Sequence, residues 1–163
     1  MKNLSFLGML VVLLSCEPTV NPTTESPEPE EAVVGDTYDA ELAAAYGADD
    51  YGMKLYVMAL LYRGPNRDQD STTAYDLQRA HLDNINRLAE EGKLLLAGPF
   101  GGDGDLRGIY IFDVPTVEEA EALTNSDPAI QAGSLRMELL PWYGSAAVNA
   151  IPEIHPKLEK ESI

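Results

Sequence analysis

Apolar residues occur along the chain in short runs that predict four β-strands between positions 53 and 147. The runs are Lys54–Tyr62, Leu94–Ala97, Arg107–Val114 and Leu135–Trp142. The first run (KLYVMALLY) is apolar almost throughout, which is typical of a strand that is covered on both faces. The third (RGIYIFDV) alternates between apolar and polar positions and is also typical of a strand. Gly98 and Pro99 directly follow the second run, so we expect them to end that strand.

Capping residues between these runs predict two helices. The segment Ser71–Thr73 offers N-caps for a helix that lasts to Glu91 and is closed by Gly92. Thr116 can cap a second helix, and Glu119 three residues later completes the pattern of a capping box. The two helices separate the first strand from the second and the third strand from the fourth.

The resulting order, β-α-β-β-α-β, predicts an α+β fold of the ferredoxin-like, split βαβ type. The segment Gly101–Asp105 (GGDGD) predicts a hairpin turn between the second and third strands. Asp127 and Pro128 open one further helical turn before the last strand. Two helices can cover only one face of a four-stranded sheet. The other face stays apolar, so we expect a homodimer formed through the sheets.

The first residues have the composition of a secretion signal. Lys2 is followed by an apolar run, Leu4–Leu14, which is shorter than the about 20 residues that span a membrane. The run leads into Leu13-Leu14-Ser15-Cys16, which resembles the lipobox of bacterial lipoproteins. We therefore expect residues 1–15 to be a signal peptide and Cys16 to carry acyl chains such as palmitate, which hold the protein on a membrane. Ordinary secretion, with a cysteine at this position by chance, is the alternative.

Residues 16–52 are predicted to form an acidic, proline-rich tether that contains no lysine or arginine. Alanines between Tyr38 and Tyr46 predict a short helix near its end. The folded domain is expected to cover residues 53–147, and a charged tail to follow at 148–163. With the lipobox, this organisation predicts a lipid-anchored protein of the bacterial cell envelope. A glutamate directly after the cysteine is compatible with sorting to the outer membrane.

Charge and cysteine content exclude several classes of function. The chain has 27 acidic residues against 11 basic ones and a net charge of -16, so a nucleic acid partner is not expected. A single cysteine excludes an internal disulfide and a thiolate metal cluster. The two histidines, His81 and His155, are too few for a histidine-rich metal site. We therefore expect neither a metal nor another cofactor.

Two residues are candidates for chemistry, and each has a structural interpretation beside the functional one. His81 lies four residues after Leu77 and four before Ile85, so it shares the helix face that should meet the sheet. It is either a core histidine bonded to a backbone carbonyl or a general acid or base. Asp127 is interpreted first as a helix cap before Pro128, and because a capping carboxylate can also orient an imidazole, the two roles are compatible. Four aromatic residues are interpreted as core: Tyr56, Tyr110, Trp142 and Tyr143.

Four segments together resemble the YCII-related family: RAHLDNINRLAEEGKLLLAGPF, RGIYIFDV, NSDPAIQAG and ELLPWYGSA. The resemblance covers about Met53 to Ala147. It implies a dimeric α+β barrel, in which ferredoxin-like domains pair sheet to sheet. It also implies that His81 and Asp127 form a catalytic His–Asp pair.

These features together predict a membrane-anchored protein that binds a small aromatic or enolisable molecule between the first helix and the sheet. His81 would move a proton and Asp127 would fix its tautomer, in an elimination or isomerisation that needs no metal. The alternative is a non-catalytic envelope lipoprotein whose dimeric barrel binds a ligand or a protein partner. The sequence does not identify the ligand in either case.

Overall fold

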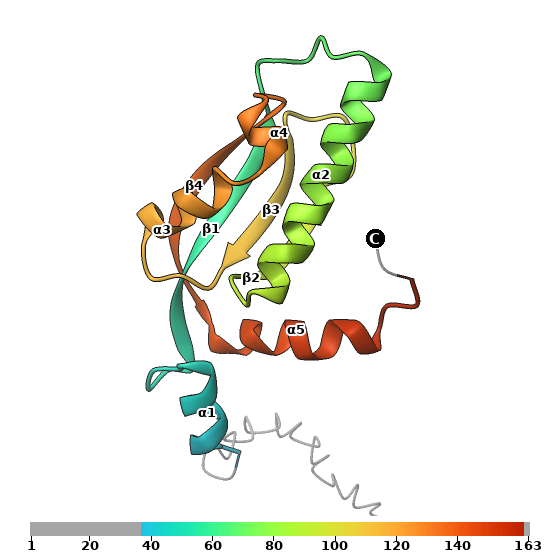
Figure 1. The fold of residues 1–163 in the computed structure, drawn as a ribbon. Helices are drawn as coiled ribbons and strands as arrows, with labels where there is room; N and C mark the ends of the chain where they lie inside the picture. The colour runs from blue at the N-terminus through green and yellow to red at the C-terminus, as the bar shows by residue number, and fades with distance from the viewer. Residues whose placement is uncertain (1–36, 162–163) are drawn as a thin grey trace, which may run out of the picture. The chain divides into compact units, whose positions relative to one another are not determined.

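The computed structural model describes residues 37–161, of which Tyr38 onward belong to one compact unit. Its centre is a four-stranded antiparallel sheet with the strand order β2-β3-β1-β4 (Figure 1). The predicted signal segment 1–15, Cys16 and most of the predicted tether lie outside the described residues.

The four strands follow the predicted runs and in part extend beyond them. They are β1 (Met53–Arg63), β2 (Leu94–Pro99), β3 (Leu106–Phe112) and β4 (Leu135–Ser145). β1 lies in the middle of the sheet and pairs antiparallel with both β3 and β4; Val57 lies opposite Phe112 on one side and Pro141 on the other. The predicted α+β class and the ferredoxin-like order are therefore confirmed.

The prediction that Gly98 and Pro99 end the second strand is wrong. Both residues belong to β2 and pair with Ile109 and Gly108 of β3. β2 lies at the edge of the described sheet, with β3 as its neighbour. A proline, which has no N–H to donate, is tolerated on an edge strand because its outer side makes no ladder hydrogen bond.

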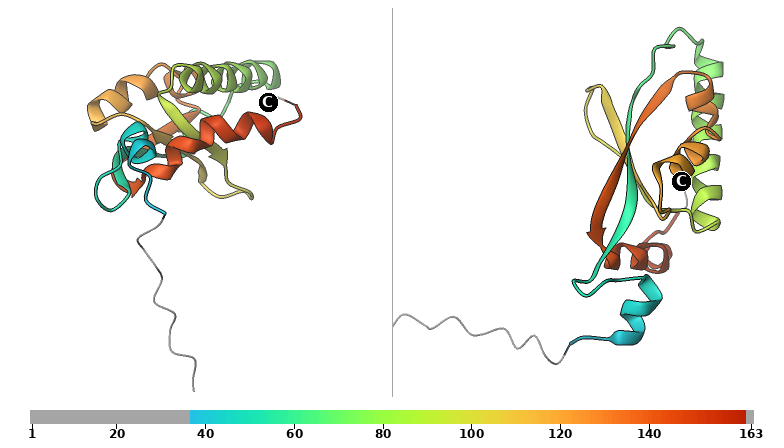
Figure 2. Two further views of the ribbon diagram at one scale, coloured as in Figure 1. Left: turned by 90° about the horizontal axis from the view of Figure 1, so that it is seen from below. Right: turned by 90° about the vertical axis from the view of Figure 1, so that its left-hand side faces the viewer.

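Helices cover one face of the sheet, as the right-hand view of Figure 2 shows. They are α2 (Ser71–Glu90), α3 (Val117–Thr124) and α4 (Pro128–Gln131). Thr116 caps α3 as predicted, because its hydroxyl accepts the N–H of Glu119 at 3.2 Å. The predicted cap of α2 is wrong. The helix is capped by Asp70, which precedes the three predicted candidates and accepts the N–H of Thr73 at 2.8 Å. A carboxylate is at least as good an N-cap as a hydroxyl.

Apolar side chains from the sheet and the helices form the core between the two layers. The buried members are Val57, Ala59, Leu61, Leu88, Leu94, Tyr110, Phe112, Val114 and Ala120. Burying one such large side chain contributes about 1.5–3 kcal/mol, so this layer accounts for much of the stability of the unit.

The chain after β4 covers one end of the opposite face. It forms helical turns, η1 (Ala146–Ala150), α5 (Ile151–Ile154) and η2 (His155–Lys157), which begin at the end of the predicted domain and continue into the stretch predicted as a charged tail. Val148 packs against Tyr56, Leu95 and Ile111 of this face. Asn149 joins these turns to the preceding helix α1 (Ala40–Tyr46), because its side-chain amide donates to the Tyr46 carbonyl at 2.9 Å.

Over the rest of that face, no helix of residues 37–161 lies against the sheet (Figure 2). Met58, Leu60 and Ile109 are only half-buried, and Leu140 is exposed. We call these four residues the open face of the sheet.

Candidate functional site

His81 lies in the middle of α2 on the side that meets the sheet. The inward stripe of this helix is Leu77, His81, Asn84 and Leu88, which follow one another at helical spacings of four, three and four. His81 and Asn84 are each 7% exposed. The packing of Leu88 into the core holds the helix in this rotation, so the imidazole is directed inward as predicted.

Asp127 meets His81 from the turn between α3 and α4. Its side chain is fully buried, and its Oδ2 lies 2.6 Å from His81 Nδ1. Its Oδ1 accepts the N–H of Ala129 at 2.8 Å and so caps α4. One carboxylate therefore caps the helix with one oxygen and contacts the imidazole with the other, so the two roles are compatible in this geometry. The partner of His81 Nδ1 is this side chain rather than a backbone carbonyl.

Tyr110 of β3 is a third member of the site. Its hydroxyl lies 3.3 Å from His81 Nε2, and the two rings are nearly parallel with centroids 6.2 Å apart. Burial, and secondly the negative charge of Asp127, raises the pKa of Tyr110 well above its ordinary value. The hydroxyl therefore keeps its proton and can donate it in a hydrogen bond to Nε2. In the tautomer in which Nε2 accepts from this hydroxyl, the imidazole proton lies on Nδ1 and is donated to Asp127 Oδ2.

The sequence predicts Tyr110 as a core residue, and the residue is buried. Its contact with His81 was not predicted. A signal for it is present: the alternation in RGIYIFDV places Tyr110 on the same face of β3 as Phe112, toward the helices. What the alternation does not provide is the position of α2 above that strand.

A second cluster of polar side chains ties α2 to the turn that carries Asp127. Arg87 Nη2 donates to Asn84 Oδ1 at 2.7 Å and to Ser126 Oγ at 2.9 Å. Ser126 Oγ also lies 3.0 Å from Asn84 Oδ1. Ser126 directly precedes Asp127, and Asn84 lies one turn after His81. The cluster therefore helps to hold Asp127 and His81 next to each other. Sequence reasoning missed it, although the helical spacing of His81 and Asn84 indicates a shared face.

The arrangement can perform proton transfer at one atom, His81 Nε2. With the proton on Nδ1, the lone pair of Nε2 is a base, and the buried carboxylate of Asp127 stabilises the imidazolium that forms. The hydrogen bond from Tyr110 is long for an O–H donor, so a substrate can replace it at small energetic cost.

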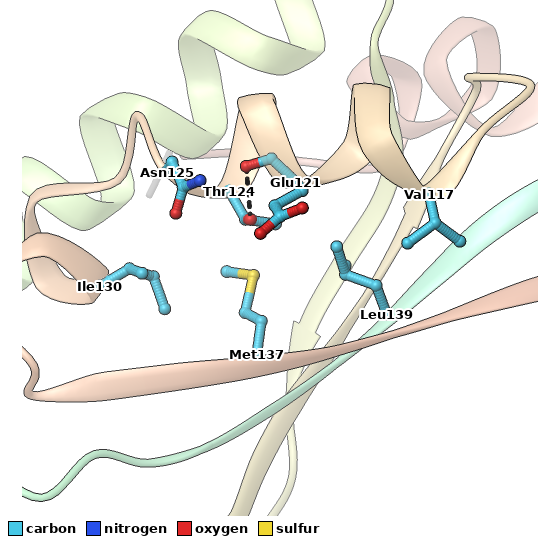
Figure 3. Close-up of a pocket in the computed structure, with 7 residues that line it drawn as sticks. All are labelled: Val117, Glu121, Thr124, Asn125, Ile130, Met137 and Leu139. Atoms are coloured by element: carbon cyan, nitrogen blue, oxygen red, sulfur yellow. Dashed lines mark hydrogen bonds between the residues drawn. The ribbon is translucent and has the colours of Figure 1, made fainter.

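A cavity with a volume of about 350 Å³ lies between α3, α4 and β4, beside the turn that carries Asp127 (Figure 3). Its lining residues are Val117, Glu121, Thr124, Asn125, Ile130, Met137 and Leu139. It flanks the turn that carries Asp127 but is lined by neither Asp127 nor His81. It is thus separate from the space between α2 and the sheet in which the sequence predicts a ligand.

Among residues 37–161, no three His, Cys, Asp or Glu side chains gather closely enough to hold a metal ion. No helix in this part of the chain has the length and apolar character needed to cross a membrane.

Comparisons with known proteins identify relatives of this domain. Residues 55–143 match the family described as the YCII-related domain. The uncharacterized protein YjpA of Bacillus subtilis (strain 168) is 29% identical over 62 residues, which are 38% of this chain and 71% of that protein. A solved structure, 5-chloro-2-hydroxyhydroquinone dehydrochlorinase (TftG) from Burkholderia phenoliruptrix AC1100 with 2,5-dihydroxybenzoquinone, is 25% identical with a TM-score of 0.39. That likeness covers 52% of this chain and 92% of the solved one.

Proposed function

The chain belongs to the YCII-related domain family, and we propose that it catalyses a proton transfer on a small aromatic or enolisable molecule. The observation that carries this proposal is the buried contact of 2.6 Å between His81 Nδ1 and Asp127 Oδ2. A carboxylate this close fixes the tautomer of the imidazole and leaves Nε2 as the reacting atom.

The reaction would begin when His81 Nε2 takes a proton from a C–H or O–H group of the substrate. The electron pair of that bond moves into the substrate, either to form an enolate or to expel a leaving group with its bonding pair. Imidazolium then returns the proton at another position, which completes an isomerisation, or releases it to solvent after an elimination. The side chains bonded to His81 are a carboxylate and a hydroxyl, and the negative charge of Asp127 disfavours a strongly anionic substrate beside it.

Hydrogen–deuterium exchange tests this function even while the substrate is unidentified. The protein is incubated in heavy water with a panel of small ketones, enols and hydroquinones, and the loss of C–H signals is followed by proton NMR. We expect exchange on part of the panel with the wild-type protein and its loss in His81→Ala. His155→Ala is the matched control, because the other histidine lies in η2 and is exposed. Exchange that persists unchanged in His81→Ala contradicts the proposal.

A second candidate, a non-catalytic binding protein, is favoured by one observation. The Tyr110 hydroxyl occupies Nε2, and His81 is nearly buried, as expected for a purely structural histidine. NMR of the His81 ring distinguishes the two functions. A ring that stays neutral and unresponsive to every added molecule favours structure, whereas a ring whose titration depends on Asp127 and on a ligand favours catalysis.

We also propose that two copies pair through the open face. This face consists of the half-buried Met58, Leu60 and Ile109 and the exposed Leu140 on adjacent strands. No helix of the described residues covers it (Figure 2). An apolar sheet face of this kind is stable in water when it is covered by another apolar surface, and a second copy offers an identical one.

A charge on this face is expected to break the dimer. Leu60 lies opposite the exposed Glu138, which is at the edge of the apolar residues of this face. Leu60→Glu would therefore place a second carboxylate beside it and among the other residues of the open face. We expect the dimer dissociation constant to rise at least about 100-fold, measured by light scattering across a concentration series. Tyr75→Glu, on the exposed side of α2, is the control. A wild-type protein that is monomeric at micromolar concentration contradicts the pairing.

Finally, we propose that lipid on Cys16 anchors the protein to a bacterial membrane, which rests on the resemblance of Leu13–Cys16 to a lipobox. The variant Cys16→Ala is expected to leave the membrane fraction after cell fractionation. If it stays there in the same amount as wild type, the lipid anchor is wrong.

A further inference from the structure

The cavity between α3, α4 and β4 has no part in the proposed reaction, and its lining has a distinct chemical character. Figure 3 shows side chains from the two helices and from the strand directed into one space. Four of the lining side chains are apolar and only partly buried: Val117, Ile130, Met137 and Leu139. They line the cavity from the helices and from the strand, so the body of a small molecule can lie against apolar groups.

The polar groups of the cavity are the Glu121 carboxylate and the Asn125 amide. Thr124 also lines it, but its hydroxyl already donates to the Glu121 backbone carbonyl at 2.9 Å. Within residues 37–161, neither the side chain of Glu121 nor that of Asn125 has a hydrogen-bond or ion-pair partner. Both residues are exposed, so a ligand would find a hydrated carboxylate and a hydrated amide beside apolar side chains.

The charge of the cavity selects the class of ligand. α3 carries Glu118, Glu119 and Glu121 and has no lysine or arginine, and no basic side chain of the described chain lines the cavity. An anion is repelled by this surface. A neutral apolar molecule gains nothing from the Glu121 carboxylate, which is exposed and keeps its water of hydration. A protonated amine replaces that water with a charge-assisted hydrogen bond.

We propose that this cavity binds a small molecule with an apolar body and a protonated amine. The ammonium group pairs with the Glu121 carboxylate, and the body lies on Met137 and Leu139, where the thioether gives favourable contacts to an aromatic ring. A volume of about 350 Å³ is at the lower end of the range for ligand sites, so the body is a single ring or a short alkyl chain. The site is independent of the proposed proton transfer, because it contains neither His81 nor Asp127.

Three molecules of one shape test the proposal: 2-phenylethylamine, 2-phenylethanol and phenylacetate, which are positive, neutral and negative at neutral pH. Each is titrated into the full chain and followed by amide chemical shifts in two-dimensional NMR. We expect the amine to shift signals of Thr124, Asn125 and Met137 with a dissociation constant of about 1 mM. We expect the alcohol to bind about tenfold more weakly and the acid not to bind.

Matched variants identify the charge responsible. Glu121→Gln keeps the shape of the side chain and is expected to weaken binding of the amine about tenfold and to remove its preference over the alcohol. Glu118→Gln removes the same charge from the same helix outside the lining and should change binding less than twofold. The proposal is overturned if the amine shifts none of these signals at about 10 mM, if the alcohol binds equally well, or if both variants behave alike. None of these outcomes depends on whether His81 is catalytic.

Discussion

Replacing Asp127 by asparagine is expected to slow the proton transfer by about 10²–10⁴-fold while the fold remains nearly as stable as in wild type. The asparagine Oδ1 can still accept the N–H of Ala129 and cap α4. Its amide nitrogen, however, can only donate to His81 Nδ1, whereas the wild-type carboxylate accepts a hydrogen bond from that atom. The imidazole proton must then move to Nε2, which points to Tyr110 and is no longer a base.

Asp127→Ala provides the contrast, because it removes both hydrogen bonds. We expect a similar loss of rate together with a loss of about 2–4 kcal/mol in the free energy of unfolding, from the missing cap and the buried N–H of His81 without a partner. Rates are measured on a molecule identified by the exchange screen, and stability by urea unfolding. The proposed role of Asp127 is wrong if the asparagine variant keeps the wild-type rate. Equal destabilisation by both variants would mean that the residue acts mainly as a structural charge.

Adding one methyl group at Gly64 is expected to lower the free energy of unfolding by about 3 kcal/mol or more. Gly64 follows β1, and its N–H donates to the Ser134 carbonyl at 2.9 Å. A Cβ at this position would lie 2.1 Å from the Gly133 carbonyl oxygen and 2.8 Å from the backbone nitrogen of Leu135. These are backbone atoms that no side-chain rotation can move, so Gly64→Ala must separate the end of β1 from the start of β4.

Gly101→Ala is the control, because a Cβ there has no neighbour within 4 Å and the residue does not have a positive φ. We expect its free energy of unfolding, measured by urea titration, to stay within about 0.5 kcal/mol of wild type. Equal stabilities of the two variants would contradict the close approach at Gly64. The displaced residues directly follow α4, so we also expect Gly64→Ala to disturb the contact between Asp127 and His81.

The elements of the fold could be predicted from local patterns. Period-two alternation located β3, and an apolar run located β1, because a strand exposes every second side chain to the same environment. The caps Thr116 and Asp127 could be identified because a capping hydrogen bond joins residues two or three positions apart. Each of these signals involves only neighbouring residues.

The choice of the α2 cap was a local error, whereas the errors at β2 and after β4 arose where a distant segment decides the local structure. Gly98 and Pro99 remain in β2 because that strand lies at the edge of the sheet, and its position depends on the order of all four strands. The segment after β4 packs onto Tyr56 and Leu95, with which no local pattern connects it. With another strand order, the same two segments would have different neighbours, so neither outcome can be read from the segment alone.

The same division applies to the candidate site. The sequence by itself determined that His81 faces the sheet and that Asp127 caps a helical turn, because helical spacing and capping are local geometry. Only the tertiary structure decided that Asp127 Oδ2 meets His81 Nδ1 and that Tyr110 meets Nε2. The partners come from α2, from the α3–α4 turn and from β3. Their distances are set by how the helices pack across the sheet, which depends on the whole core at once.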